Sequence, residues 1–256
     1  MKIDKVVLIT GGSQGIGAQT ARTLAKAGYQ LALNYRHNEE KALTLKQELT
    51  MTYQIKVQLY QGDISSENDV KRIVTGIKED FGRLDILILN AGPFIHEEIK
   101  IKDYTVSQWH NMIATNLNSF FYLVKEFLPR MEQQNWGRII TFGYDQIENI
   151  SGWPLRGAYA AAKTGVAAAM RSLATEEKSY NITVNMVCPG DIKANEKEAT
   201  IKTARQQTSD TEKRKATGED IARVVTFLCS VDSDYLTGNI INLSGGENII
   251  ARKQFK

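Results

Sequence analysis

The stretch VVLITGGSQGIG, residues 6–17, passes from four apolar residues into a cluster of glycines. A helical pattern follows at once, so the order is strand, glycine turn, helix. Glycine lets the chain turn tightly and lets a diphosphate approach the backbone, while the free N–H groups of the helix favour an anion. A glycine cluster alone also serves ordinary turns. With this strand before it and this helix after it, the stretch predicts a phosphate-binding turn.

Length and composition favour one globular α/β domain over residues 1–256. The chain has 256 residues, 42% of them hydrophobic and 24% charged, which is ample for a single large core. Short β-rich runs alternate with longer helical patterns, as in parallel strands joined by crossover helices. We expect a Rossmann-type, doubly wound sheet with helices on both faces, because the strand cores are nearly continuous apolar runs. The expected strands lie near 5–10, 30–35, 55–61, 86–90, 138–143, 182–188 and 239–243.

Several classes of function are disfavoured by charge and by residue spacing. The net charge of +3 is small and basic residues form no stripe, so we expect no nucleic-acid partner. Neither a signal peptide nor a membrane span is apparent, which predicts a soluble, cytoplasmic protein. Cys188 and Cys229 lie far apart in apolar patterns, typical of small buried side chains. His37, His96 and His110 lack metal-ligand spacing, and we expect no metal.

Tyr159 and Lys163 lie four residues apart in GAYAAAKT, residues 157–164, a run rich in helix-forming alanine. Both side chains should project from one face of a helix. A phenol titrates at about pH 10, and a nearby ammonium group favours phenolate and lowers that pKa. Taken alone, the spacing is more often two amphipathic residues on a solvated helix face. Together with the glycine turn, the pair predicts a tuned proton donor.

Polar and glycine-containing segments follow the expected strands where parallel strands place ligands. Asp63-Ile64 follows the third strand, Asn90-Ala91-Gly92 the fourth and Pro189-Gly190 the sixth. The segment 194–217 is polar, charged and almost without large apolar residues. We expect it to form a mobile flap over this edge of the sheet.

The chain resembles the classical short-chain dehydrogenase/reductase family over essentially its whole length. Five ordered motifs carry the likeness: the glycine turn, Asn90-Ala91-Gly92, Tyr159-x3-Lys163, Pro189-Gly190 and Leu243-Ser244-Gly245-Gly246. The resemblance implies carbonyl–alcohol interconversion with a nicotinamide cofactor. Hydride arriving at a carbonyl carbon leaves negative charge on oxygen, which a poised phenol quenches by giving up its proton.

The resemblance also implies roles for single residues. Tyr159 would be the catalytic acid/base, Lys163 would hold the nicotinamide ribose and lower the pKa of the tyrosine, and Asn116 would anchor a relay water. From the residues alone, the preferred interpretation is a helix-surface amide for Asn116 and a helix cap ahead of Ser65 for Asp63. The residues expected to bind the cofactor are Gly11, Ser13, Gln14, Gly15, Ile16, Gly17, Asn34, Arg36, Asp63, Ile64, Asn90, Ala91, Gly92, Tyr159, Lys163, Pro189, Gly190 and Ile192.

The end of the second strand bears on the choice of cofactor. An NAD enzyme usually places an acid there against the ribose 2′-hydroxyl, but residues 31–37 contain none. Asn34 removes the repulsion that a 2′-phosphate would meet, and Arg36 can supply a charge-assisted contact to it. This favours NADP(H), the alternative being that Arg36 is an ordinary surface arginine.

One position departs from the family pattern. The family places a catalytic serine just after the fifth strand, where this chain has Tyr144. The Tyr144 phenol could donate the hydrogen bond, or Asp145 or Ser151 could serve; pteridine reductases carry an aspartate at this position. Alternatively Tyr144 packs as an aromatic residue in a slow or inactive site.

Within the family the likeness is nearest to the β-ketoacyl-acyl carrier protein reductases, through Asn34-Tyr35, 137–141, 159–163 and 235–238. Their basic carrier-docking residues correspond here to Asn135 and Tyr180, although Arg130 and Lys178 could compensate, and Ala194 replaces a cofactor-contacting threonine.

Three functions therefore stay open. The first is an NADPH-dependent ketoreductase, which could act on acyl thioesters held by a carrier protein. The second is a reductase of another small molecule, such as a pterin or ketone, and the third an NADP(H)-binding scaffold. We also expect a homo-oligomer, a tetramer as is common in the family, paired through helices near 105–135 and 157–180.

Overall fold

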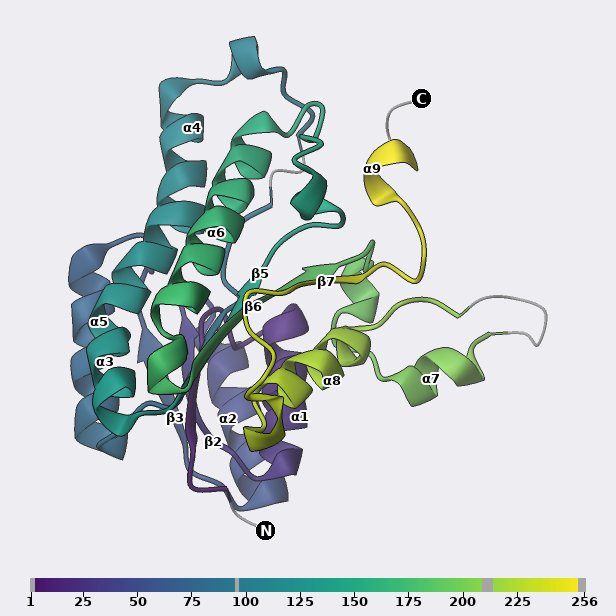
Figure 1. Ribbon diagram of the computed structural model, residues 1–256. Coiled ribbons are helices and arrows are strands. Elements are labelled where there is room, and N and C mark those ends of the chain that lie inside the picture. The colour runs from purple at the N-terminus through teal and green to yellow at the C-terminus, as the bar shows by residue number, and fades with distance from the viewer. Residues whose placement is uncertain (1–2, 95–96, 209–213, 253–256) are drawn as a thin grey trace.

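The computed structural model describes residues 3–94, 97–208 and 214–252, which fold around a parallel sheet (Figure 1). Its strands are Val6–Ile9 (β1), Gln30–Tyr35 (β2), Val57–Gln61 (β3), Ile86–Leu89 (β4), Gly137–Phe142 (β5), Ile182–Pro189 (β6) and Ile240–Leu243 (β7). The expected seven strands are all confirmed, with ends that differ by at most two residues. They lie in the order β3-β2-β1-β4-β5-β6-β7, the doubly wound Rossmann-type arrangement predicted.

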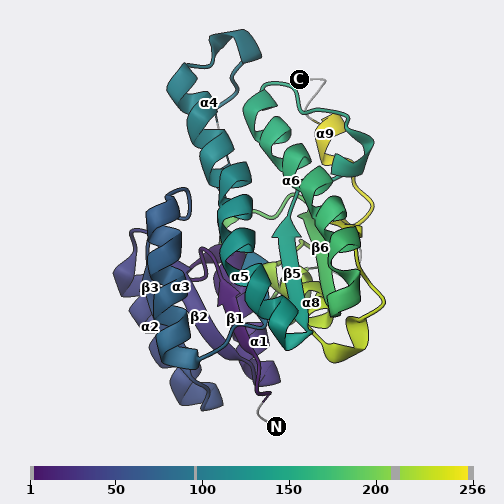
Figure 2. The same cartoon turned by 60° about the vertical axis from the view of Figure 1, so that its left-hand side comes forward.

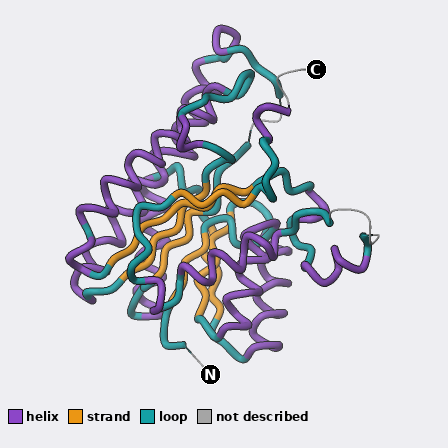
Figure 3. Tube along the Cα trace, turned by 45° about the vertical axis from the view of Figure 1, so that its right-hand side comes forward, coloured by secondary structure: helices purple, strands orange, loops and turns teal. Residues whose placement is uncertain are grey.

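Helices cover both faces of the sheet, as the layers in Figures 2 and 3 show. One core joins the sheet to α1, α2 and α8, and the other joins it to α3, α5 and α6. The helices are Gly15–Ala27 (α1), Glu39–Tyr53 (α2), Glu67–Phe81 (α3), Val106–Ile113 (α4), Ser119–Gln134 (α5), Gly157–Glu176 (α6), Ile201–Gln206 (α7), Gly218–Leu228 (α8) and Ile249–Arg252 (α9). Shorter 3-10 turns cover Ile101–Asp103, Ile147–Asn149, Lys178–Tyr180, Ala194–Glu196 and Val231–Ser233.

The topology predicts a ligand-binding crevice beside the first glycine turn. β1 pairs with β2 on one side and with β4 on the other, so the chain changes direction across the sheet at β1. Every residue of β1 and β4 is buried, which explains the purely apolar sequences VVLI and ILIL. Ligands of such sheets bind where the strand order reverses, outside the carboxyl ends of the strands.

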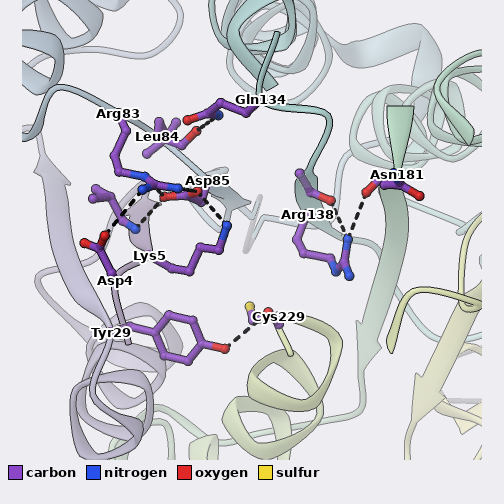
Figure 4. A network of polar contacts seen from close by, with 12 residues as sticks. Asp4, Lys5, Tyr29, Arg83, Leu84, Asp85, Gln134, Arg138, Asn181 and Cys229 are labelled. Atoms are coloured by element: carbon purple, nitrogen blue, oxygen red, sulfur yellow. Dashed lines mark hydrogen bonds and ion pairs between the residues drawn. The ribbon is translucent and has the colours of Figure 1, made fainter. Parts of the chain in front are cut away.

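A buried carboxylate joins the opposite, amino ends of β1 and β4 (Figure 4). Asp85 is completely buried and accepts hydrogen bonds from Lys5 Nζ (3.1 Å), Val6 N (2.9 Å) and the Arg83 guanidinium (2.7 and 2.9 Å). Its charge is therefore fully partnered, as a buried carboxylate requires. Because this network lies at the far end of the strands, it stabilises the fold without contributing to the crevice.

The expected flap, 194–217, is partly helical. It contains a 3-10 turn, Ala194–Glu196, and α7, which Figure 1 shows standing away from the sheet. Thr200 begins α7 because its Oγ1 accepts a hydrogen bond from Thr203 N at 3.1 Å. Residues 209–213 of this segment lie outside the described residues. Within the part of the chain that is described, no helix combines the length and apolar character needed to cross a bilayer.

Candidate active site

The glycine turn is held in place by Asn90, which follows β4. Asn90 Nδ2 donates to Thr10 O (3.0 Å) and Gly11 O (3.1 Å), and Gly11 has a φ of +60°, which favours glycine. A methyl group at Gly17 would collide with Gly11 O and lie 2.6 Å from Asn90 Nδ2. The two predicted motifs therefore pack directly against each other, and the Asn90 amide is occupied in shaping the turn.

The first turn of α1 presents the N–H groups predicted to receive phosphate. The predicted residues Ser13, Gln14, Gly15, Ile16 and Gly17 all lie at this turn. The side chain of Gln14, the N-cap residue, makes no capping hydrogen bond, so it leaves these N–H groups to other partners. Gly15 N donates instead to a carboxylate, Glu198 Oε1, at 2.8 Å. The turn thus already holds an anion, and its donor set fits a phosphate group.

The predicted adenosine end is built around Asn34 and Arg36. Asn34 is buried; its Oδ1 accepts from Gly11 N (3.3 Å) and its Nδ2 donates to Tyr60 O (3.1 Å) and Gly62 O (3.0 Å). Its amide therefore joins β2 to β3 and to the glycine turn. Arg36 is exposed at the surface.

Two of the predicted cofactor residues pair with each other at this end. Arg36 Nε lies 3.1 Å from Asp63 Oδ2, while Asp63 Oδ1 also accepts hydrogen bonds from Ser65 N (2.9 Å) and Ser65 Oγ (2.7 Å). Asp63 therefore braces a turn ahead of α3 and does not cap that helix, because the N-cap is Ser66, whose side chain accepts a hydrogen bond from Asp69 N. The next predicted residue, Ile64, is buried.

Tyr159, Lys163 and Asn116 come together near Gly92, which follows β4. Tyr159 and Lys163 lie on α6, with Lys163 Nζ 5.9 Å from the centroid of the Tyr159 ring. A methyl group in place of a Gly92 hydrogen would lie 2.5 Å from Asn116 Oδ1 and 3.2 Å from Lys163 Nζ. The amide oxygen and the ammonium group therefore approach one point beside the backbone of Gly92.

Asn116 lies on a π-helical turn, Ala114–Asn118, between α4 and α5. Such single turns occur often at functional sites, because they turn a side chain out of the regular helical ladder. Asn116 Nδ2 donates to Pro93 O at 3.3 Å. Its Oδ1 is buried and has no hydrogen-bond partner among the described residues. This oxygen can accept a hydrogen bond from a water molecule or a ligand hydroxyl.

The electrostatics of the pair differ from the sequence-based expectation. Burial raises the pKa of Tyr159, and burial lowers the pKa of Lys163 to about 8. Both side chains lose solvent, which penalises the charged form of each. The expected lowering of the tyrosine pKa by lysine is therefore wrong for the protein without cofactor, because desolvation dominates.

Three residues could replace the serine after β5, and they lie in different environments. Tyr144 is buried, and its hydroxyl lies 3.1 Å from Thr164 Oγ1, the residue that follows Lys163. Asp145 Oδ2 accepts from Ile249 N (3.4 Å), whereas its Oδ1 is buried without a partner among the described residues. Ser151 is exposed on the following loop. Which of the three supports the reaction stays a prediction.

Three aromatic rings gather around Tyr159, the predicted acid. The Phe94 ring meets Tyr159 edge-on with centroids 5.2 Å apart, and the Trp153 and Tyr144 rings each lie 6.2 Å from it. Phe94 and Trp153 are half-buried and also contact each other, at 5.6 Å. Sequence analysis missed both, although Phe94 stands only two residues after Gly92.

The predicted residues after β6 join the last strand. Gly190 N donates to Leu243 O at 3.0 Å, and a methyl group at Gly190 would lie 2.8 Å from the Ser244 backbone. Pro189 ends β6 and Ile192 is buried. Both cysteines are free and buried, as expected. His96 lies outside the described residues, and no group of His, Cys, Asp and Glu within them could hold a metal ion.

Comparison with known proteins agrees with this geometry. The family model described as "Enoyl-(Acyl carrier protein) reductase" matches residues 11–248, from the glycine turn to the segment after β7. The chain belongs to the short-chain dehydrogenase/reductase family. This is a family of oxidoreductases that use nicotinamide cofactors.

Relatives and a solved structure share almost the whole chain. "Putative oxidoreductase YtkK" of Bacillus subtilis (strain 168) is 42% identical over 250 residues, covering 96% of this chain and 98% of that protein. "3-oxoacyl-[acyl-carrier-protein] reductase FabG" of Staphylococcus aureus (strain Mu50 / ATCC 700699) is 33% identical, covering 96% and 99%. The structure titled "Structure of putative 3-oxoacyl-reductase from bacillus thuringiensis" is 40% identical, with a TM-score of 0.91 over 96% of this chain and 99% of that one.

Proposed function

We propose that this family member is an NADPH-dependent carbonyl reductase. The observation that carries the proposal is the meeting of Asn116 Oδ1 and Lys163 Nζ beside Gly92, with Tyr159 on the same helix as the lysine. The bound cofactor would supply the hydride. The glycine turn would hold its diphosphate, and the chain supplies the proton and the polar groups around it.

Tyr159 is suited to donate that proton. The phenol is protonated at neutral pH and has a proton to give, although burial raises its pKa and so opposes the release of that proton. Charge that develops on the phenol oxygen during the transfer is stabilised by the nearby ammonium of Lys163, whose pKa of about 8 leaves it mostly charged at neutral pH. Asn116 Oδ1 can hold a water molecule that returns the proton. General acid catalysis of this kind contributes roughly 10² to 10⁴ in rate.

The Tyr159→Phe variant tests this assignment against the scaffold alternative. It removes only the hydroxyl, so we expect NADPH binding to persist while turnover falls by about two to four orders of magnitude. Undiminished turnover would remove Tyr159 from the mechanism. A wild-type protein that binds NADPH but reduces no substrate of a broad carbonyl panel would favour the scaffold.

The preference for NADPH over NADH rests on the end of β2. No acid occupies residues 31–37, and Arg36 is exposed, with its Nε paired with Asp63. The rest of the guanidinium can contact a 2′-phosphate. We expect Arg36→Ala to weaken NADPH binding and to leave NADH binding nearly unchanged. Equal affinities of the wild-type protein for the two dinucleotides in a calorimetric titration would contradict the assignment.

The names of the relatives suggest the first substrate to try. One curated relative and the solved structure are named as 3-oxoacyl reductases. We therefore propose 3-oxoacyl thioesters, free or held on a carrier protein, as the primary substrate class. NADPH oxidation with an acetoacetyl thioester is the direct assay. A Tyr144→Ser variant restores the serine expected after β5, and increased turnover would show that the missing hydroxyl limits the wild-type enzyme.

The aromatic rings favour a second candidate, a flat conjugated carbonyl compound such as a pterin or an aryl ketone. The Phe94 and Trp153 rings form rigid walls next to Tyr159, and flat rings stack favourably on such walls. If this class is the substrate, Phe94→Leu and Trp153→Leu should raise its KM more than that of an acetoacetyl thioester. Equal effects on both substrates would remove this candidate.

The predicted homotetramer is part of the proposal. Phe121 on α5 and Trp109 on α4 expose large apolar surfaces on the helices expected to pair. Exposed apolar surface of this kind often marks a site of contact with another protein chain. Light scattering tests the prediction, and a monomeric mass would contradict it.

A further inference from the structure

The segment after β6 reaches the phosphate-binding turn through Glu198. Its Oε1 accepts a hydrogen bond from Gly15 N at 2.8 Å, and its Oε2 lies 2.9 Å from Arg22 Nη1. Gly15 is the first residue of α1, and Arg22 lies two turns further along the same helix. A single carboxylate from the predicted flap therefore binds both an N–H group of the turn and a cation on the helix behind it.

The position of Glu198 is that of an anionic ligand. The N–H groups in the first turn of a helix have no partner within the helix, and the helix dipole favours negative charge beside them. A dinucleotide diphosphate would need the same donors and the same favourable potential. Phosphate oxygens bound to these N–H groups and the Glu198 carboxylate would also repel each other, because both are negatively charged. Glu198 and a diphosphate consequently cannot both use the N-terminus of α1 to full effect.

Neighbouring contacts show that Glu198 is not needed to balance Arg22. Arg22 already makes a two-point ion pair with Glu48 on α2, at 2.8 and 2.9 Å. Lys197 lies directly over Gly15, where a methyl group would be 3.7 Å from Lys197 Cδ. The Lys197-Glu198 pair is therefore seated against the turn, while Glu48 contacts the same arginine from the other side without touching the turn.

We propose that Glu198 competes with the diphosphate of the dinucleotide for the N-terminus of α1, and so lowers the affinity of the free protein for its cofactor. The inference rests on the proposed dinucleotide site. Binding of the cofactor displaces the Glu198 carboxylate from Gly15 N. Glu198 thus links the flap to the occupancy of the phosphate-binding turn.

Calorimetric titrations of Glu198→Gln, with Glu48→Gln as the matched control, test the proposal. Each substitution removes one carboxylate paired with Arg22, but only Glu198→Gln removes negative charge from the phosphate-binding turn. We expect Glu198→Gln to bind NADPH and NADH about two- to fivefold more tightly, by a similar factor for both, because the diphosphate is common to them. Adenosine 2′-monophosphate, which lacks the diphosphate, should bind both variants and the wild type alike.

The results separate this inference from the function on which it rests. Unchanged or weaker dinucleotide binding by Glu198→Gln, or an equal gain from Glu48→Gln, would overturn the competition while leaving the cofactor site intact. A gain for adenosine 2′-monophosphate would also overturn it, since the effect would not depend on the diphosphate. If neither the wild type nor Glu198→Gln binds a dinucleotide, both the competition and the proposed function fail.

Discussion

Replacing Lys163 by methionine should change how the stability of the protein depends on pH. Lys163 is 6% exposed, and it forms no ion pair with any carboxylate of the described residues. Burial lowers its pKa from the ordinary 10.5 to about 8. The unfolded chain therefore binds a proton more readily than the folded protein between these values, and the folded state gains stability as pH rises through them.

The size of the effect follows from the two pKa values. Below about pH 8 the folded protein carries the full free-energy cost of burying a charged lysine. Above about pH 10.5 the lysine is neutral in the folded and the unfolded state, so this cost is absent. One unit of pKa corresponds to about 1.4 kcal/mol, so linkage gives about 2 kcal/mol between about pH 8 and about pH 10. Methionine has a similar length and no charge, so the stability of Lys163→Met lacks this dependence on pH.

Urea unfolding of both proteins at the two pH values measures the difference. The free energy of unfolding of the wild type, relative to Lys163→Met, should rise by about 2 kcal/mol from the lower to the higher pH. Subtracting the variant cancels the titrating groups that lie far from Lys163. If this difference in the free energy of unfolding stays constant or falls between the two pH values, Lys163 keeps an ordinary pKa. A partner in the site would then compensate the burial of its charge.

Other substitutions test the packing of the site and of the sheet. Gly92→Ala places a methyl group 2.5 Å from Asn116 Oδ1 and 3.2 Å from Lys163 Nζ, so kcat should fall at least tenfold while circular dichroism stays unchanged; wild-type kinetics would contradict the geometry. Asp85→Asn should lower the free energy of unfolding by about 1–3 kcal/mol without changing KM, because this carboxylate lies at the far end of the strands. Tyr144→Phe loses one hydrogen bond and should cost about 0.5–1.5 kcal/mol in urea unfolding; a fall in kcat as well would give its hydroxyl a direct role.

Most of the fold could be predicted because its signals are local. Continuous apolar runs marked the strands, and the glycine cluster between a strand and a helix marked the turn at β1. The order of motifs along the chain also identified the residues at the carboxyl ends of the strands. Strand ends were less accurate, since hydrogen bonding to a neighbouring strand, rather than composition, decides where a strand stops.

The π-turn at Asn116 could not be predicted, and neither could the partner of Tyr144. The residues Ala114–Asn118 carry no sequence pattern that distinguishes a π-helical turn from an α-helical one, so the extra residue in the turn is visible only in the structure. Tyr144 looked like a replacement for serine, yet its hydroxyl meets Thr164, which lies on a separate element. Contacts between residues distant in sequence leave no local pattern.

The sequence by itself determined the strand–turn–helix order and the presence of Tyr159 and Lys163 on one helical face, because each depends on residues close together in the chain. It also determined the family, because the order of the motifs along the chain identifies it. Only the tertiary structure decided the electrostatics and the contacts of the site. Burial raises the pKa of Tyr159 although a lysine is near, and Glu198 reaches Gly15 across 183 residues. Desolvation and long-range contact depend on how distant segments pack, which no single stretch of sequence records.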